Sequence, residues 1–335
     1  MWELVNRTPY LAERTWVQDA EGAKHYVVVV KATWLIKPDG STELAEEKVE
    51  PLLLPKYRGE DGTSSLLYEG DLIAGKPGTD LYVNGSAHAP GGRPAPRVSV
   101  ALRIGKLEKV LEVLGEQRFG RDLVGEVVPS TPLPFVQAPI IYEHAYGGFD
   151  ATDPDPSKQK LFDANPVGTG HVAQRSTLVG QRAPSIGFPG HGWGTKGAAG
   201  FGAVCSYWTP RRQHAGTYDA KWVLERKPLL PADFDPRFHM CAPADQQFFP
   251  HLRGGEQVEL VHMTPSGVLR FTIPKVYLAF RTRILGKHTE HRANLVTVVV
   301  EPDVPRVITV WHTSIPCHHH ADYLEETRIR QLRYV

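Results

Sequence analysis

The sequence predicts a mainly β fold, with antiparallel sheets in one or two sandwich-like lobes, long Pro- and Gly-rich loops and few short helices. Three observations predict it. Short apolar runs alternate with turn residues toward both ends of the chain, one segment alternates strictly between apolar and polar residues, and 31 Gly and 28 Pro occur among 335 residues. Frequent Gly and Pro interrupt long helices, which disfavours helical bundles, coiled coils and helical solenoids.

The N-terminal third contains the clearest strand signals. Residues 25–36 are rich in β-branched and aromatic residues and stop at the turn sequence Pro-Asp-Gly at 38–40. Residues 97–104 alternate apolar and polar side chains, and Gly105-Lys106 predicts a hairpin turn into residues 107–114. This pattern favours an antiparallel sheet with one solvated face.

The middle of the chain shows little periodicity. Residues 129–202 hold many Pro and Gly residues and predict long ordered loops, which are often functional. One short helix is expected over residues 217–227, capped by Thr217, with Trp222 and Val223 on its inner face.

The C-terminal third returns to strands. The tail from residue 321 to 335 fits a helix or a strand, and the strands before it are expected over residues 257–263, 268–273, 276–283, 295–300 and 306–312. We therefore expect an N-terminal β lobe over residues 1–150 and a loop-rich connector with a C-terminal β lobe over 151–335; the alternative is one intertwined domain.

Charge, hydrophobicity and cysteine content limit the classes of function that the sequence suggests. The 38 Lys and Arg residues nearly balance 37 Asp and Glu residues, which argues against a general surface for nucleic acid. The N-terminus lacks a signal-peptide pattern and the longest aliphatic run is Val27–Val30, so neither secretion nor membrane insertion is expected. Three scattered cysteines predict reduced thiols, so we expect a cytoplasmic protein.

Motifs that could carry chemistry are weak. Residues 192–197 (GWGTKG) have dinucleotide-fingerprint spacing, but the residues before them make a poor strand and the glycines after them oppose a helix, so no cofactor is expected. Asp150, Asp153 and Asp155 lack the pattern of a calcium loop, and Asp233 with Asp235 favours a structural turn. No serine lies in a nucleophile elbow, so no catalytic residue is assigned.

The sequence Cys317-His318-His319-His320 is the strongest metal candidate, because thiolate and imidazole are good zinc ligands. Adjacent residues on a strand alternate in direction, and no second ligand pair at a recognised spacing is present. A solvated polar turn is the simpler interpretation, so no metal ligand is assigned.

Two of the seven tryptophans are candidates for exposed anchors in a binding surface: Trp193, set among glycines, and Trp208, near Pro210. These two residues are the predicted partner-binding residues.

Several motifs follow one another in a specific order. They are Asn6-x-Thr8-Pro9-Tyr10, Tyr146-Gly147-Gly148-Phe149-Asp150, Asn165-Pro166-Val167-Gly168-x-Gly170, Gly200-Phe201-Gly202, Trp208-x-Pro210-Arg211-Arg212, Gly216-Thr217-Tyr218-Asp219-x-x-Trp222, Arg226-x-Pro228-x-x-Pro231-x-Asp233-Phe234-Asp235-x-Arg237-Phe238, Ala242-Pro243-x-Asp245-Gln246 and Leu252-x-Gly254-Gly255-Glu256-x-Val258. This order resembles the bacterial family of type VI secretion adaptors that is catalogued as a domain of unknown function.

The resemblance implies a non-enzymatic cytoplasmic adaptor or chaperone. Such a protein binds a secreted toxin effector or a PAAR-type spike-tip protein and helps to load it onto the spike protein. Two other classes stay open: a metal-assisted hydrolase that uses the Cys317–His320 cluster, and a carbohydrate-binding β module that uses exposed tryptophans.

Overall fold

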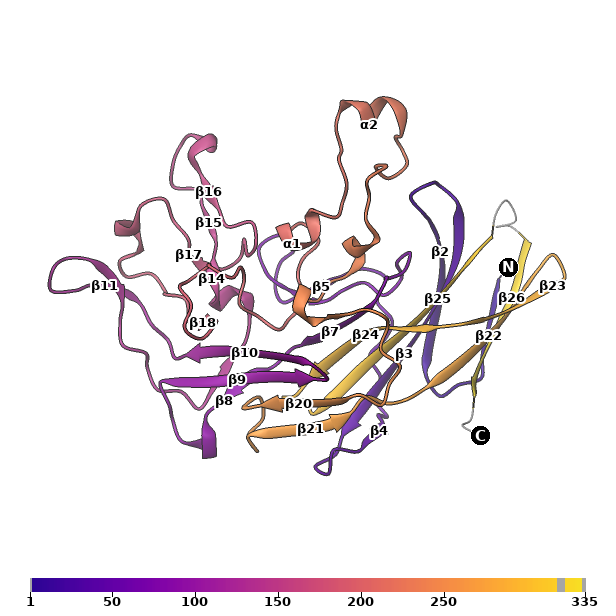
Figure 1. The fold of residues 1–335 in the computed structure, drawn as a ribbon, viewed down its shortest axis with the longest axis horizontal. Coiled ribbons are helices and arrows are strands. Elements are labelled where there is room, and N and C mark those ends of the chain that lie inside the picture. Colours follow the sequence, from indigo (N-terminus) through magenta and orange to yellow (C-terminus); the bar gives the residue numbers. More distant parts are fainter. Residues whose placement is uncertain (1, 318–322, 333–335) are drawn as a thin grey trace.

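The computed structural model describes residues 2–317 and 323–332, and within them the fold is mainly β, as the sequence predicts (Figure 1). Three larger sheets dominate. The seven-stranded sheet has the order β19-β7-β24-β25-β3-β2, with β4 also paired to β3; the five-stranded sheet is β18-β10-β9-β20-β21; the four-stranded sheet is β1-β26-β22-β23.

The strands of these sheets have the following bounds. They are β1 (Glu3–Asn6), β2 (Leu11–Gln18), β3 (Lys24–Ile36), β4 (Thr42–Leu44), β7 (Thr79–Val83), β9 (Arg97–Ile104), β10 (Leu107–Leu114), β18 (Ile186–Gly187), β19 (Gln247–Phe248), β20 (Gln257–Val261), β21 (Val268–Thr272), β22 (Tyr277–Ile284), β23 (Lys287–Arg292), β24 (Asn294–Glu301), β25 (Arg306–Pro316) and β26 (Leu324–Leu332).

The sequence of strand β3 is a continuous apolar run, and the structure explains why it does not alternate. Val28 and Val30 face the largest core, whereas Val27 and Val29 belong to a second cluster with Val310 on the opposite face of the sheet. Both faces of this strand are therefore covered, and every position favours a β-branched apolar residue.

One core joins the three larger sheets. It includes Val30 of the seven-stranded sheet, Leu102 and Leu260 of the five-stranded sheet, and Phe280 and Ile329 of the four-stranded sheet. The arrangement is a sandwich in which two smaller sheets pack against one large sheet. The hairpin β9–β10 has the bounds expected from its alternating sequence, and the C-terminal tail forms the strand β26.

The seven-stranded sheet combines strands from both ends of the chain. Strands β2, β3, β4 and β7 come from the N-terminal part, and β19, β24 and β25 come from the C-terminal part. The division into domains at residue 150 stays a prediction.

The segment between β10 and β20 is called the connector here and spans residues 115–256. It supplies the edge strands β18 and β19 to two of the larger sheets, and otherwise contains short two-stranded pairs and two short helices, α1 (Thr209–Arg212) and α2 (Ala220–Glu225). The small pairs of the molecule are β5 (Lys56–Tyr57) with β6 (Leu66–Tyr68), β8 (Ser86–His88) with β13 (Gln137–Pro139), β11 (Phe119–Arg121) with β12 (Val127–Pro129), β14 (Tyr146–Gly147) with β17 (Thr169–Gly170), and β15 (Phe149–Asp150) with β16 (Lys160–Leu161). Single turns of 3-10 helix lie at Pro90–Gly92, Tyr142–His144, Pro156–Lys158, Arg175–Leu178, Pro236–His239 and Ala244–Gln246.

The helix expected over residues 217–227 exists but is shorter, and two details of its prediction are wrong. Its N-cap is Asp219, whose carboxylate accepts from the Trp222 N–H at 2.8 Å, whereas Thr217 bonds Asp233 instead. Val223 faces solvent because α2 lies at the end of a projecting arm with no sheet behind it (Figure 1).

No helix in the described part of the chain is both long and apolar enough to cross a bilayer.

Candidate functional site

Trp193 lines an open groove at one end of the five-stranded sheet, and its side chain is 36% exposed. The groove has a volume of about 430 Å³ and is lined by Arg97, Glu112, Leu114, Gly187, Phe188, Gly190, His191 and Trp193. The Trp193 ring packs on Gly187 so closely that a Cβ at that position would lie 2.8 Å from it. The position of the indole is therefore set by the backbone beneath it.

The lining of the groove is partly apolar and partly charged. Phe188 and Trp193 are its large apolar residues, and Arg97 and Glu112, also in the lining, form an ion pair of 3.3 Å. Such a groove accommodates one large apolar side chain next to a polar or charged group, as a peptide segment presents them.

Trp208 is not exposed, so the expectation that it forms a surface anchor is wrong. Its side chain is 0% exposed and packs edge-on against Tyr142, with ring centroids 5.0 Å apart. Trp208 directly precedes α1. The turn into this helix directs the indole inward, into a core cluster that includes Cys205 and Cys241. Trp208 therefore fixes the connector to the large sheet and does not lie on the surface.

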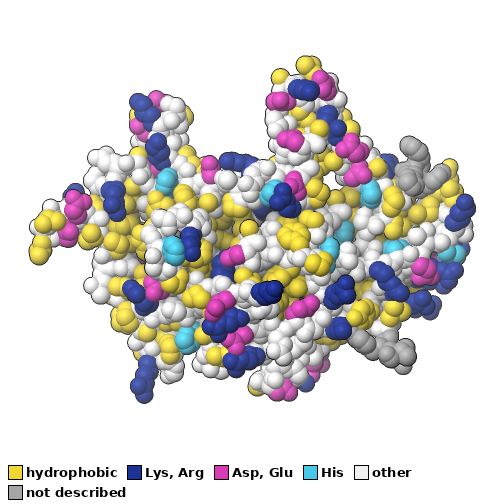
Figure 2. Space-filling view, viewed as in Figure 1, with side chains coloured by type: hydrophobic (Ala, Val, Ile, Leu, Met, Phe, Trp, Pro, Cys, Tyr) yellow, Lys and Arg dark blue, Asp and Glu magenta, His cyan; other side chains and the backbone are white. Residues whose placement is uncertain are grey.

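Two arms of the connector project away from the sheets (Figures 1 and 2). The arm with β15 and β16 carries the exposed side chains of Phe149 and Leu161. The arm with α2, residues 214–236, carries Tyr218, Val223 and Leu224, of which Leu224 is 85% exposed. Isolated exposed leucines are ordinary, but apolar residues gathered at a projecting tip are typical of contact surfaces.

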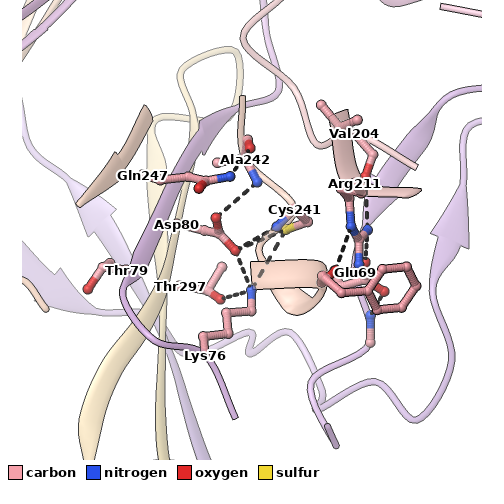
Figure 3. Close-up of polar contacts among 12 residues, drawn as sticks. Glu69, Lys76, Thr79, Asp80, Val204, Arg211, Cys241, Ala242, Gln247 and Thr297 are labelled. Carbon is pink, nitrogen blue, oxygen red and sulfur yellow. Dashed lines mark hydrogen bonds and ion pairs between the residues drawn. The ribbon is translucent and has the colours of Figure 1, made fainter. Parts of the chain in front are cut away.

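The connector is anchored by a buried polar network centred on Asp80 of β7 (Figure 3). One carboxylate oxygen of Asp80 accepts from Lys76 Nζ at 2.6 Å and from the Cys241 N–H at 2.9 Å, and the other accepts from the Ala242 N–H at 3.0 Å. Lys76 Nζ also donates to Thr297 Oγ1 at 2.8 Å. Asp80 thus ties the connector segment at 241–242 to two neighbouring strands.

A second buried ion pair holds the base of the α2 arm. The Arg211 guanidinium, from α1, pairs with Glu69 and also donates to the carbonyl oxygens of Val204 at 2.9 Å and Phe238 at 3.0 Å. Figure 3 shows Arg211 and Glu69 pointing toward each other beside the Asp80 network. Arg211 therefore joins both ends of the arm to the loop before β7.

Gln246 connects the buried network to the five-stranded sheet. Its buried amide donates to the carbonyl oxygens of Leu81 at 2.8 Å and Phe201 at 2.9 Å, and accepts from Lys109 Nζ at 2.9 Å. Because Leu81 is in β7 and Lys109 is in β10, this one side chain links two sheets through the connector.

The electrostatics of the network are those of a structural anchor. Burial lowers the pKa of Lys76, but the adjacent Asp80 carboxylate outweighs burial and raises it, so the amine stays charged. Burial raises the pKa of the Cys241 thiol well above its ordinary value, and burial raises that of Cys205 to about 11. Both thiols are protonated at neutral pH and are poor nucleophiles.

The metal candidate falls partly outside the described residues. His318, His319 and His320 are not described, while the Cys317 thiol is buried and donates to the Lys24 carbonyl oxygen at 3.0 Å. Within the described ranges, no three His, Cys, Asp or Glu side chains come together in a way that could hold a metal ion.

The remaining motifs have structural surroundings. Residues 192–197 form turns between β18 and α1 with no helix directly after them, as the sequence context indicates. Asp150, Asp153 and Asp155 each accept a backbone N–H two residues further on, which is the geometry of a loop. Asp233 and Asp235 bond to Thr217 and Arg237 and shape the base of the α2 arm.

Lys76 and Asp80 belong to no motif in the sequence. Asp80 lies 161 residues from its partner Cys241, so no spacing could reveal the network. Arg211 and Gln246 belong to the ordered motifs that carry the family resemblance, but those motifs did not reveal what the two side chains contact.

No curated protein and no solved structure matches the chain. A family model does match it, over residues 21–312, and its description is "Uncharacterized protein conserved in bacteria (DUF2169)". The match begins just before β3, ends within β25 and includes the connector, the Trp193 groove and the buried network. The chain therefore belongs to this uncharacterised bacterial family, DUF2169.

Proposed function

We propose that the chain is a non-enzymatic adaptor of the bacterial cytoplasm. It binds a type VI secretion effector or a PAAR-type spike-tip protein and helps to load it onto the spike. The family resemblance of the motif order suggests this class. The observation that carries the proposal is the connector itself, which presents the Trp193 groove and the α2 arm while buried side chains fix its base.

The energetics of this arrangement suit a binding protein. A loop that is already ordered loses little conformational freedom when a partner binds, so more of the contact energy appears as affinity. Large aromatic side chains in partly buried positions are the usual anchors of such contacts. Trp193 has this position, and the exposed tip of the α2 arm with Leu224 provides a second contact.

Co-purification from the native bacterium tests the proposal. The full chain is captured from the cytosol while the secretion system is expressed, and the proteins that accompany it are identified by mass spectrometry. Stoichiometric recovery of a toxin or spike-tip protein is the expected result. Repeated recovery of the chain alone would contradict the adaptor class.

Surface variants locate the contact. Trp193→Ala and Leu224→Ser should each reduce partner recovery by about 10-fold, the effect of losing an interface anchor. Leu54→Ser is the matched control, because Leu54 is 72% exposed and lies outside the connector. Unchanged recovery with Trp193→Ala would remove the groove from the proposal while leaving the adaptor class standing.

A further inference from the structure

The outer face of the four-stranded sheet carries many arginines. Phe280 of β22 and Ile329 of β26 are opposite each other and fully buried, so their neighbours in sequence face outward. These outward neighbours include Arg281 and Arg328, which are also opposite each other. Figure 2 shows Lys and Arg side chains gathered at the right-hand end of the molecule, where Figure 1 places β22, β23 and β26.

One row across this face is especially basic. Ala279 of β22 lies between Arg330 of β26 on one side and Arg292 of β23 on the other. Arg7 directly follows β1, and its N–H donates to the Ile329 carbonyl oxygen, which places Arg7 beside Arg330. The row therefore holds three exposed arginines, and its fourth member, Ala279, is uncharged.

This row differs from its neighbours in how its charge is balanced. Arg281 pairs with Glu290 at 3.7 Å, and Arg328 pairs with Glu326 at 2.5 Å. Among the residues that the structure describes, Arg7 and Arg292 have no ion-pair partner, and Arg330 shares the carboxylate of Glu290 with Arg281, at a distance of 4.0 Å. The cationic row is therefore available to an external anion.

We propose that the row of Arg7, Arg330 and Arg292 binds an acidic segment of a protein partner. Arginine presents a planar fork of donors that matches a carboxylate with two parallel hydrogen bonds. Neighbouring strands lie about 4.8 Å apart, so Arg330 and Arg292 stand roughly 10 Å apart, within reach of acidic side chains about 7 Å apart on one extended segment. The inference is independent of the secretion proposal.

A polypeptide fits this face better than a polyphosphate does. Glu3, Glu290 and Glu326 are in strands of the same sheet and interrupt the positive charge, which would repel a continuous run of phosphates. The chain as a whole carries a net charge of only +1, so it lacks the broad basic surface of a nucleic-acid-binding protein. Separate carboxylates on a flexible acidic segment can avoid these glutamates.

Fluorescence anisotropy with the full chain tests the inference. The probe is a labelled ten-residue peptide of alternating Glu and Ser; a 20-nucleotide single-stranded DNA and phosphatidylserine vesicles are the competing probes. The test variant is Arg7→Gln, Arg292→Gln, Arg330→Gln. Its matched control is Arg93→Gln, Arg121→Gln, Arg175→Gln, which removes the same charge from exposed arginines elsewhere.

The wild-type chain should bind the peptide, the test variant about 10-fold more weakly, and the control variant within about 2-fold of wild type. Raising NaCl from about 50 to 300 mM should weaken wild-type binding several-fold, because these charges are exposed. If the triple variant melts earlier than wild type, the double variant Arg7→Gln, Arg292→Gln is used and should weaken binding about 5-fold. Equal binding by wild type and test variant, no binding at 1 mM peptide, or tighter binding of DNA or vesicles would overturn the inference.

Discussion

Removing the carboxylate of Asp80 should be one of the most damaging single substitutions in this protein. Asp80 is 0% exposed, and the side chain of its partner Lys76 is 4% exposed. Asp80→Ala leaves a buried ammonium without its counter-charge, which costs about 3–5 kcal/mol. It also leaves the buried N–H groups of Cys241 and Ala242 without their acceptor, which adds about 1–3 kcal/mol for each.

Two further variants, Lys76→Met and the double variant with Asp80→Ala, test whether the two side chains stabilise the fold as a pair. Lys76→Met should cost less than Asp80→Ala, since the carboxylate keeps its two backbone donors. The double variant should be more stable than the sum of the single effects by at least ~1 kcal/mol, because neither charge is then left unpaired. The surface pair of Lys37 and Glu43 is the control, and Glu43→Ala should cost below about 1 kcal/mol.

Urea unfolding followed by tryptophan fluorescence measures these differences. A stability of Asp80→Ala within about 1 kcal/mol of wild type, or simple addition of the effects of Asp80→Ala and Lys76→Met, would show that the two side chains do not form a stabilising buried pair. Limited proteolysis gives a second readout, because loss of the anchor should expose the connector to cleavage before the sheets unfold.

Three further predictions follow from burial. Trp208→Ala should cost about 3–5 kcal/mol of unfolding free energy, whereas Trp193→Ala should cost below about 1 kcal/mol; equal losses in urea unfolding would contradict the different burial of the two residues. Burial lowers the pKa of His312 to about 4, so the neutral side chain contributes stability above pH 6.5 that is lost as the pH falls through 4, by up to about 3 kcal/mol. Urea midpoints measured from pH 7 to 4 should fall less steeply for His312→Gln than for wild type, and parallel curves would contradict this. Cys205 and Cys241 should not react with a thiol reagent at pH 8 until urea unfolds the chain, and rapid labelling of native protein would contradict their burial.

The parts of the fold that could be predicted are those whose sequence signals lie within one short stretch of the chain. The hairpin of β9 and β10 was predictable to the residue because apolar alternation and a Gly-containing turn lie within one short stretch. Pairing between distant strands was not, since β24 pairs in parallel with β7 more than 200 residues earlier and no local pattern specifies this. The pairing of strands that are distant in the chain is specified by their packing in the folded core.

Of the two tryptophans that the sequence predicted to be exposed, one is exposed in the structure. Trp193 was found because an aromatic residue among glycines stands out in the sequence, and it is partly exposed. Trp208 was predicted to be exposed because Pro210 lies nearby, but the turn into the short helix α1 directs its side chain inward. Exposure depends on the direction of one side chain, and a sequence without clear periodicity does not reveal that direction.

Burying so many charges beneath the connector needs an explanation, because well-packed apolar residues are often as stabilising as a buried ion pair. An apolar patch tolerates several ways of docking a loop, whereas Asp80 satisfies Lys76, Cys241 and Ala242 only in one position. We infer that the network fixes one position of the connector segment at 241–242 and of the adjoining base of the α2 arm, so that the arm is already in place when a partner arrives. The inference requires that Asp80→Ala weaken partner recovery more than its loss of folded protein explains, and equal losses of the two would contradict it.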